Sequence, residues 1–300
     1  MFDYAREGGV IMGLFVGLSF LMLALVQEPA SPSQPAIESG YVEAGEGRLY
    51  YDTAGHGPVV VLIHDGLVHR ETWESQFPLL ARTHHVIRYD RRGYGRSDIP
   101  AKPFSNVEDL HTLLTSLKVE RATLIGCSMG GLLSIQYTLA HPERVSGLIL
   151  VGPIVSGYGF SDHFRARGDR GKPGPEATVE QQIEYWTTTD PWIMAPGSTG
   201  ARHRMKELLA ANPRNLTLPY NLLRGPKEPA AGQLSRISTP TLIIVGEQDI
   251  PDVHAHAGVI EAGIPGARRV VMTGAGHLVH MEVPDAFNRI VLEFLAGPKK

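Results

Sequence analysis

The chain has 300 residues, of which 43% are hydrophobic, which is sufficient for one sizeable hydrophobic core. Its formal net charge of −3 gives no electrostatic reason to expect nucleic acid as a partner. Because Cys127 is the only cysteine, an intramolecular disulfide bond is excluded, and cysteine content does not identify a cellular compartment.

The N-terminal segment is strongly apolar. Residues 10–26 contain only apolar residues, glycine and serine, a length between a signal-peptide core and the roughly 20 residues that span a bilayer. Residues 27–35 are polar and rich in proline, as in a linker. We therefore expect residues 1–39 to form a leader and linker that serve export, either cleaved or kept as a membrane anchor. Since acidic residues offset Arg6, a cytoplasmic protein with an unusual leader is the alternative.

The rest of the chain alternates between strand and helix patterns. Residues 40–43 and 48–52 predict two short strands joined by a glycine turn, as an antiparallel edge. Short apolar runs then predict a mostly parallel sheet with helices on both faces. The predicted parallel strands are residues 59–63, 85–89, 122–125, 145–151, 241–245 and 269–272. The clearest helix begins at Ser105, with Glu108 completing a capping box, and the last begins near Pro284.

The alternation breaks after the strand at residues 145–151. Helical patterns at residues 179–186 and 202–211, separated by glycine and proline, predict a helical insertion over residues 153–235. The core then consists of residues 40–152 and 236–300. Several aromatic residues and a methionine of the insertion either line a substrate pocket or pack the insertion onto the core. They are Tyr158, Phe160, Tyr185, Trp186, Trp192 and Met194.

A serine flanked by glycines follows the strand at residues 122–125, in the sequence Gly-Cys-Ser-Met-Gly-Gly of residues 126–131. At the junction of a strand and a helix this spacing is typical of a nucleophile elbow, where glycines allow a turn that exposes the serine hydroxyl. Ser128 is therefore the candidate nucleophile. Cys127 is the alternative, but the alternation of a strand directs its side chain away from the site.

A serine nucleophile needs a base and an acid that orients the base, in chain order serine, acid, histidine for this type of elbow. Asp249 follows the strand at residues 241–245, and His277 follows the last strand. The carboxyl ends of parallel strands meet at one edge of a sheet, so we expect these residues to lie together. The rivals are Asp252, interpreted as a helix N-cap, and His280, interpreted as a surface histidine.

An acyl-transfer site also needs donors for the oxygen that becomes negatively charged. The strand at residues 59–63 ends in His64-Asp65-Gly66, and we expect the Gly66 N–H and the Met129 N–H to form this oxyanion hole. The Leu67 N–H is the alternative donor from the first loop.

Taken together, these residues resemble the α/β-hydrolase family over residues 41–295. The motifs that carry this resemblance are His64 with Gly66, the segment Asp-Arg-Arg-Gly-Tyr-Gly-Arg-Ser of residues 90–97, the elbow, Asp249 and His277. The resemblance implies the α/β-hydrolase fold, with the insertion as a helical cap. It also implies structural roles for His64, Asp90 and Arg92. Many members have His-Gly where this chain has His64-Asp65, and we expect the Asp65 side chain to point to solvent.

The expected activity is hydrolysis of a small carboxylic ester through an acyl-enzyme. A serine at the elbow argues against haloalkane dehalogenases and epoxide hydrolases, which resemble this chain but carry a carboxylate there. The sequence around the last helix resembles enol-lactonases, and the same triad serves carbon–carbon bond hydrolases, so both activities stay open. A non-catalytic binding protein is a further alternative. We expect no cofactor and no metal, because His254 and His256 have no further ligands at zinc spacing.

Overall fold

The computed structural model describes residues 35–169, 173–174, 176–190, 192–218 and 220–297. The apolar stretch at residues 10–26 lies outside these described residues. Within the described ranges, no helix has both the length and the apolar character required to cross a bilayer.

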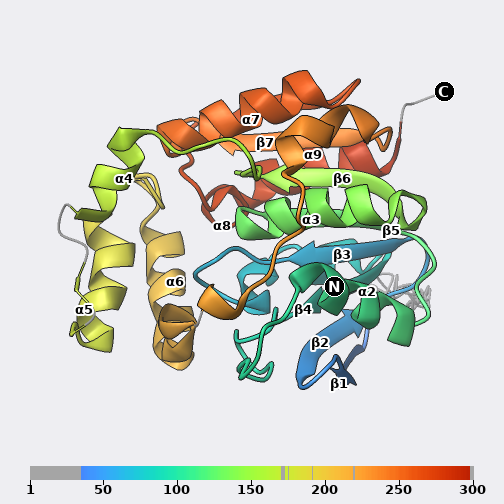
Figure 1. The fold of residues 1–300 in the computed structure, drawn as a ribbon, viewed down its shortest axis with the longest axis horizontal. Helices are drawn as coiled ribbons and strands as arrows, with labels where there is room; N and C mark the ends of the chain where they lie inside the picture. Colours follow the sequence, from blue (N-terminus) through green and yellow to red (C-terminus); the bar gives the residue numbers. More distant parts are fainter. Residues whose placement is uncertain (1–34, 170–172, 175, 191, 219, 298–300) are drawn as a thin grey trace, which may run out of the picture. The chain divides into compact units, whose positions relative to one another are not determined.

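The core is built on one eight-stranded sheet with the strand order β1-β2-β4-β3-β5-β6-β7-β8 (Figure 1). β2 pairs antiparallel with β1 and β4, and the other neighbouring strands are parallel. The strands are β1 (Ile37–Glu43), β2 (Arg48–Ala54), β3 (Val59–Ile63), β4 (His85–Tyr89), β5 (Ala122–Cys127), β6 (Val145–Val151), β7 (Thr241–Gly246) and β8 (Arg268–Met272). The expected mostly parallel sheet is confirmed, and β1 begins at Ile37 rather than at residue 40.

Helices pack on the sheet and on one another. α3 packs on β5 and β6 and contacts α2, while α7 packs on β7 and β8. The α-helices are α1 (Phe77–Leu80), α2 (Asn106–Ser116), α3 (Met129–Ala140), α4 (Asp162–Asp169), α5 (Val179–Glu184), α6 (Thr199–Ala211), α7 (Pro251–Gly263), α8 (Val279–Glu282) and α9 (Pro284–Leu295). Shorter helical turns are η1 (Arg70–Trp73), η2 (Pro142–Arg144), η3 (Tyr185–Thr189), η4 (Pro213–Thr217), η5 (Tyr220–Leu222) and η6 (Ala230–Arg236). As predicted, Ser105 caps α2, since its Oγ accepts the Glu108 N–H at 3.4 Å. The other half of the predicted capping box, a bond from the Ser105 N–H to the Glu108 side chain, is not formed between these two described residues.

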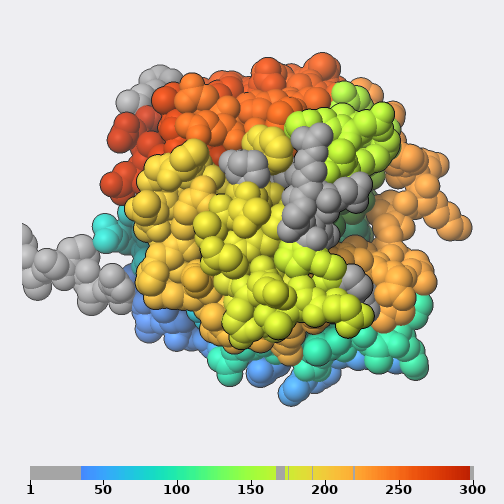
Figure 2. Space-filling view, turned by 90° about the vertical axis from the view of Figure 1, so that its left-hand side faces the viewer, coloured from blue at the N-terminus to red at the C-terminus, as the bar shows by residue number. Residues whose placement is uncertain are grey.

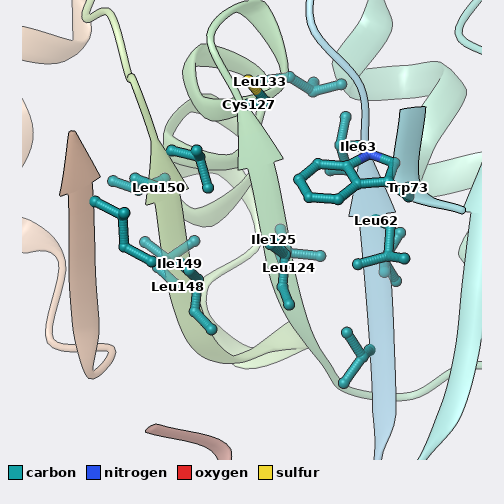
Figure 3. Close-up of a cluster of buried hydrophobic side chains, with 14 of the residues drawn as sticks. Leu62, Ile63, Trp73, Leu124, Ile125, Cys127, Leu133, Leu148, Ile149 and Leu150 are labelled. Carbon is teal, nitrogen blue, oxygen red and sulfur yellow. The ribbon is translucent and has the colours of Figure 1, made fainter. Parts of the chain in front are cut away.

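The centre of the sheet is buried on both faces. Figure 3 shows apolar side chains of β3, β5 and β6 together with Trp73 and Leu133. Leu62, Leu124 and Ile149 are completely buried, as continuous apolar runs in parallel strands predict. The resulting core gives the loops at the strand ends a rigid base.

The register of the parallel strands aligns their carboxyl ends. Ile63 pairs with Gly126, Cys127 pairs with Val151, and Gly246 pairs with Met272. The loops that follow β3, β5, β6, β7 and β8 therefore leave the sheet at the same edge.

A helical stretch lies between β6 and β7, and we call residues 153–235 the inserted segment. It carries α4, α5 and α6 on the side toward which the arrows of β3 and β6 point (Figure 1). Figure 2 views this side, where the yellow part with α5 and α6 occupies much of the surface. The helical pattern expected at residues 179–186 is divided, because α5 ends at Glu184 and the π-helical turn η3 follows.

Removal of a central core side chain should destabilise the fold. Ile149→Ala deletes a fully buried side chain of β6 and should lower the free energy of unfolding by about 2–5 kcal/mol. Ile99, which is 56% exposed, supplies the control, and Ile99→Ala should change this free energy by less than about 0.5 kcal/mol. Denaturant unfolding of both variants measures the difference, and equal losses would contradict the described core.

Candidate active site

Ser128 occupies the predicted sharp turn between β5 and α3. Its backbone angles, φ 51° and ψ −111°, lie in a region that residues other than glycine rarely adopt. Such a conformation costs on the order of 1–3 kcal/mol and persists only where the surroundings impose it. The Ser128 N–H donates to the Val151 carbonyl at 2.8 Å, which ties the turn to the end of β6.

The glycines around Ser128 are required by close backbone contacts. A Cβ at Gly126 would overlap the Gly130 carbonyl, and a Cβ at Gly130 would overlap the Ile63 carbonyl. The start of α3 therefore lies directly against the ends of β5 and β3. This packing explains why the predicted spacing of glycine around the serine is necessary here.

Cys127 is not available for chemistry. Its side chain is fully buried in the core beside Leu133 (Figure 3). Burial raises the pKa of the thiol well above its usual range, and the charges of Asp65 and Asp249 raise it further. The thiol therefore remains protonated and inaccessible, so Cys127 does not compete with Ser128.

His277 and Asp249 are in direct contact. His277 Nδ1 lies 2.8 Å from Asp249 Oδ1, and both residues are at least 95% buried. Asp249 Oδ1 also accepts the Ile250 N–H at 2.6 Å. The structure thus brings together two of the predicted site residues that are far apart in the sequence.

Gly152 connects this pair to the serine turn. It has φ +50°, and a Cβ there would lie 2.9 Å from His277 Nδ1 and 3.1 Å from Asp249 Oδ2. The preceding residue, Val151, accepts the Ser128 N–H through its carbonyl. The end of β6 therefore borders all three residues, a role that the sequence analysis did not assign to Gly152.

The inserted segment is bound to the His277 loop. The His277 N–H lies 3.2 Å from the carbonyl oxygens of Trp192 and Ile193. Glu282 accepts the Gly276 N–H at 3.0 Å and the Ala195 N–H at 2.7 Å. Burial raises the pKa of Glu282, although these donors act in the opposite direction. The Glu282 carboxylate therefore joins the loop before His277 to the inserted segment.

Asp252, the alternative candidate for the acid, was interpreted as a helix N-cap, and its contacts in the structure match neither role. Its carboxylate accepts the Ser161 N–H and, at 2.8 Å, the Ser161 hydroxyl. The N-cap of α7 is Ile250, so the interpretation of Asp252 as a helix N-cap is wrong. Asp252 instead anchors the start of α4 to the core, whereas the carboxylate that contacts His277 is that of Asp249.

The rival base His280 is a core residue, so its interpretation as a surface histidine is wrong. It is 0% exposed, its ring stacks on Trp73 at 4.0 Å, and its Nε2 lies 2.8 Å from Thr72 Oγ1. Burial, followed by the neighbouring His277, lowers the pKa of His280 to about 3. A short helix after His277 directs this side chain into the core rather than to the surface.

The loop after β3 is held by buried polar groups. His64 Nε2 accepts the Arg91 N–H at 2.9 Å, and its Nδ1 lies 2.8 Å from the Asp65 carbonyl oxygen. Burial lowers the pKa of His64 well below its usual value, so the ring is neutral. The structural role expected for His64 agrees with these contacts.

Asp65 does not point to solvent, so that expectation is wrong. The residue is 2% exposed, and its Oδ1 accepts the Leu67 N–H at 2.6 Å and the Val68 N–H at 3.2 Å. The carboxylate turns back onto its own loop because these successive amides face it. As a result, the Leu67 N–H is already bonded, whereas the Gly66 N–H has no hydrogen-bond partner among the described residues.

Two tyrosines that the sequence analysis did not select complete this loop. The hydroxyl oxygens of Tyr94 and Tyr220 each lie 3.0 Å from the Gly66 carbonyl oxygen and 2.5 Å from one another, so the two hydroxyl protons are shared among these three oxygens. Tyr94 belongs to the core, whereas Tyr220 belongs to the inserted segment and is 49% exposed. Tyr94 lies within the motif of residues 90–97, but only the fold shows what its hydroxyl contacts.

The loop after β4 is braced as the resemblance implies. Asp90 accepts the Arg96 N–H at 2.8 Å and the Arg70 guanidinium at 3.0 Å. Arg92 forms an ion pair with Asp109 at 2.7 Å. These contacts make the loop a support for the edge of the sheet.

The residues of the inserted segment that were candidates for a substrate pocket have different surroundings. Met194 and Tyr185 are buried, while Phe160 stacks on Phe164 and contacts the ring of His256 at 4.7 Å. The contacts of Phe160 attach the inserted segment to α7, which agrees with the packing alternative.

His256 belongs to this packing. Its Nδ1 accepts the Val155 N–H at 3.1 Å. Over the residues that the structure describes, no group of three or more His, Cys, Asp or Glu side chains is arranged to hold a metal ion.

Comparison with known proteins gives consistent matches. A family model described as the alpha/beta hydrolase fold matches residues 58–284. A putative carbamate hydrolase, RutD, of Azorhizobium caulinodans is 28% identical over 85% of this chain and 97% of its own length. A 2-hydroxy-6-oxononadienedioate/2-hydroxy-6-oxononatrienedioate hydrolase of Escherichia coli is 30% identical over 85% of this chain and 94% of its own. The solved structure of Est816, described as an N-acyl homoserine lactone degrading enzyme, has a TM-score of 0.70 and 27% identity, covering 85% of this chain and 100% of that chain.

The buried His280 should make stability depend on pH. Its folded pKa of about 3 lies below the value of about 6.5 in an unfolded chain, so only the unfolded chain binds this proton between those pH values. The free energy of unfolding should therefore rise with pH across this window, by up to about 1.4 kcal/mol per unit from this residue. His280→Gln should reduce that slope in denaturant unfolding between pH 4 and 7, and an unchanged slope would contradict the assignment.

Proposed function

Because the chain belongs to the α/β-hydrolase family, we propose that it is a serine hydrolase that cleaves small carboxylic esters. The observation that carries the proposal is the position of Val151 and Gly152. The Val151 carbonyl accepts the Ser128 N–H. Gly152 lies against His277 and Asp249. A nucleophile, a base and an acid thus border one strand end.

In the proposed first step, the Ser128 hydroxyl attacks the ester carbonyl and His277 Nε2 takes its proton. His277 Nδ1 faces Asp249 Oδ1 at 2.8 Å, so in this mechanism Nδ1 carries the proton that Asp249 accepts, and Nε2 is the atom that takes the Ser128 proton. Asp249 also stabilises the imidazolium that forms. The imidazolium then gives its proton to the departing alcohol, which leaves the acyl group on Ser128.

The proposed oxyanion hole consists of the Gly66 and Met129 N–H groups. Met129 is the first residue of α3, where the backbone N–H groups of a helix have no intrahelical acceptor and the helix dipole is positive. Gly66 is favoured over Leu67 because Asp65 already accepts the Leu67 N–H. Each donor is expected to supply roughly 3 kcal/mol of transition-state stabilisation.

In the second step, water attacks the acyl-enzyme with His277 as the base and releases the acid. A lactone is an internal ester, so the same groups would open a lactone ring. This reaction is the second candidate because Est816, at 27% identity, is described as degrading a lactone. Matched panels of p-nitrophenyl esters and lactones, with a carbamate and a carbon–carbon substrate included, separate the candidates.

Ser128→Ala should abolish hydrolysis. Loss of the nucleophile should lower kcat for a short p-nitrophenyl ester by roughly five to six orders of magnitude, without loss of the folded state. An organophosphonate should label the wild-type protein stoichiometrically at Ser128 and should not label the variant. Full activity in Ser128→Ala, or ligand binding without any Ser128-dependent product, would contradict a serine hydrolase and favour a binding protein.

Asp249→Ala and Asp252→Ala form a matched pair. Removal of Asp249 leaves His277 Nδ1 without its carboxylate partner and should lower kcat by roughly 10⁴-fold. Removal of Asp252 frees Ser161 and should lower thermal stability, with less than about a tenfold effect on kcat. If kcat instead fell more in Asp252→Ala, the acid would be assigned to the wrong residue.

A further inference from the structure

Arg91 is a buried cation directly behind the loop that carries Gly66. It is 1% exposed, its Nη2 donates to the Asp65 carbonyl oxygen, and its guanidinium lies 4.7 Å from the centre of the Tyr94 ring. Its Nε has no hydrogen-bond partner, and the guanidinium makes no ion pair with any residue that the structure describes. Burial of a cation without an ion pair is energetically costly. The bond from Arg91 to the Asp65 carbonyl oxygen is therefore the contact that stabilises the buried charge.

That acceptor belongs to the peptide unit that ends in the Gly66 N–H. A trans peptide is planar, so the Asp65 carbonyl and the Gly66 N–H point in opposite directions along one rigid plane. The Asp65 carbonyl oxygen lies 2.8 Å from His64 Nδ1 and also accepts from Arg91 Nη2. The two contacts hold this end of the plane, and thereby fix the direction of the Gly66 N–H at the other end.

The next peptide unit is held as well. The Gly66 carbonyl oxygen lies 3.0 Å from both hydroxyls of the hydrogen-bonded pair Tyr94 and Tyr220. The Leu67 N–H in the same plane donates to Asp65 Oδ1. Consecutive peptide planes on either side of Gly66 therefore have defined orientations. Among the described residues, the Gly66 N–H has no hydrogen-bond partner, so it can bind an oxyanion.

We propose that Arg91 is a positioning residue that orients and polarises the Gly66 N–H through the Asp65–Gly66 peptide. The inference rests on the proposed function, in which this N–H stabilises the oxyanion. A cation bound to the carbonyl oxygen withdraws electron density from the amide, which makes its N–H a stronger donor. Because the peptide is oriented before the reaction, little reorganisation is needed when the oxyanion forms.

A purely structural role for Arg91 makes a different prediction. The backbone N–H of Arg91 bonds His64, and that contact survives any substitution except proline. Replacement of the side chain therefore removes the contacts to the Asp65 carbonyl and to Tyr94 while leaving the backbone contact. If these contacts only supported the loop, replacing Arg91 would lower the free energy of unfolding. Binding of the transition state would then weaken no more than binding of the substrate.

The test compares Arg91→Met and Arg91→Lys with the wild type, using a short p-nitrophenyl ester and a trifluoromethyl ketone. Ser128 adds to this ketone through an Oγ–carbon bond, His277 takes the proton, and the former carbonyl oxygen carries the negative charge. We expect Arg91→Met to lower kcat and weaken ketone binding by about tenfold each, with KM within about twofold, since loss of a whole donor costs 10²–10³-fold. Arg91→Lys keeps a cation and should show a loss of about threefold.

Arg92→Met is the matched control. Arg92 is a neighbouring buried arginine whose guanidinium bonds Asp109 and the Ala44 carbonyl and does not contact the Gly66 loop. Its replacement should lower the thermal unfolding temperature but leave kcat and ketone affinity of the folded protein within about twofold.

Unchanged kcat and ketone affinity in Arg91→Met would overturn the positioning role, as would an equal loss in Arg92→Met. If Arg91→Met does not fold, Arg91→Gln replaces it as the variant without the cation, and wild-type ketone affinity in Arg91→Gln would overturn the role. Organophosphonate labelling of the wild-type protein separates the two proposals. Labelling at Ser128 with full activity in Arg91→Met would reject only the role of Arg91, whereas failure to label and to hydrolyse any ester would reject the proposed function and this role together.

Discussion

The constraint on which the site depends is the turn at Ser128. Its φ of 51° places a non-glycine residue in an unfavourable conformation, and the surrounding backbone imposes that conformation. Contacts at Gly126 and Gly130 press α3 against the ends of β5 and β3, and the Val151 carbonyl holds the Ser128 N–H. The serine side chain is consequently carried by the rigid centre of the sheet rather than by a free loop, which is the arrangement that a preorganised nucleophile requires.

Much of the fold and the centre of the site could be predicted because they depend on local patterns. β3, β4 and β6 have the predicted boundaries, and β3 is a continuous apolar run of the kind typical of strands buried on both faces. The glycines around Ser128 indicated the turn because few other residues tolerate such contacts. Asp249 and His277 were predicted from their positions after strands, and parallel register then brings those strand ends to one edge.

The remaining features depend on tertiary partners that a pattern does not reveal. His280 was assigned to the surface, yet it stacks on Trp73, which is distant in the sequence. Asp252 resembled a helix cap, but its carboxylate binds Ser161 of the inserted segment. Asp65 and Arg91 are charged, and charged residues are usually exposed. Their burial follows from the polar backbone groups of one loop, which offer each of them a partner.

The central claim is that Ser128 attacks a carbonyl whose oxygen is then bound by the Gly66 and Met129 N–H groups. A crystal structure of the protein inhibited by an organophosphonate tests it most directly. The account predicts phosphorus bonded to Ser128 Oγ, with the phosphonyl oxygen at hydrogen-bond distance from both amide nitrogens and with His277 Nε2 facing Ser128. An adduct on another residue, or a phosphonyl oxygen directed away from both amides, would contradict the account.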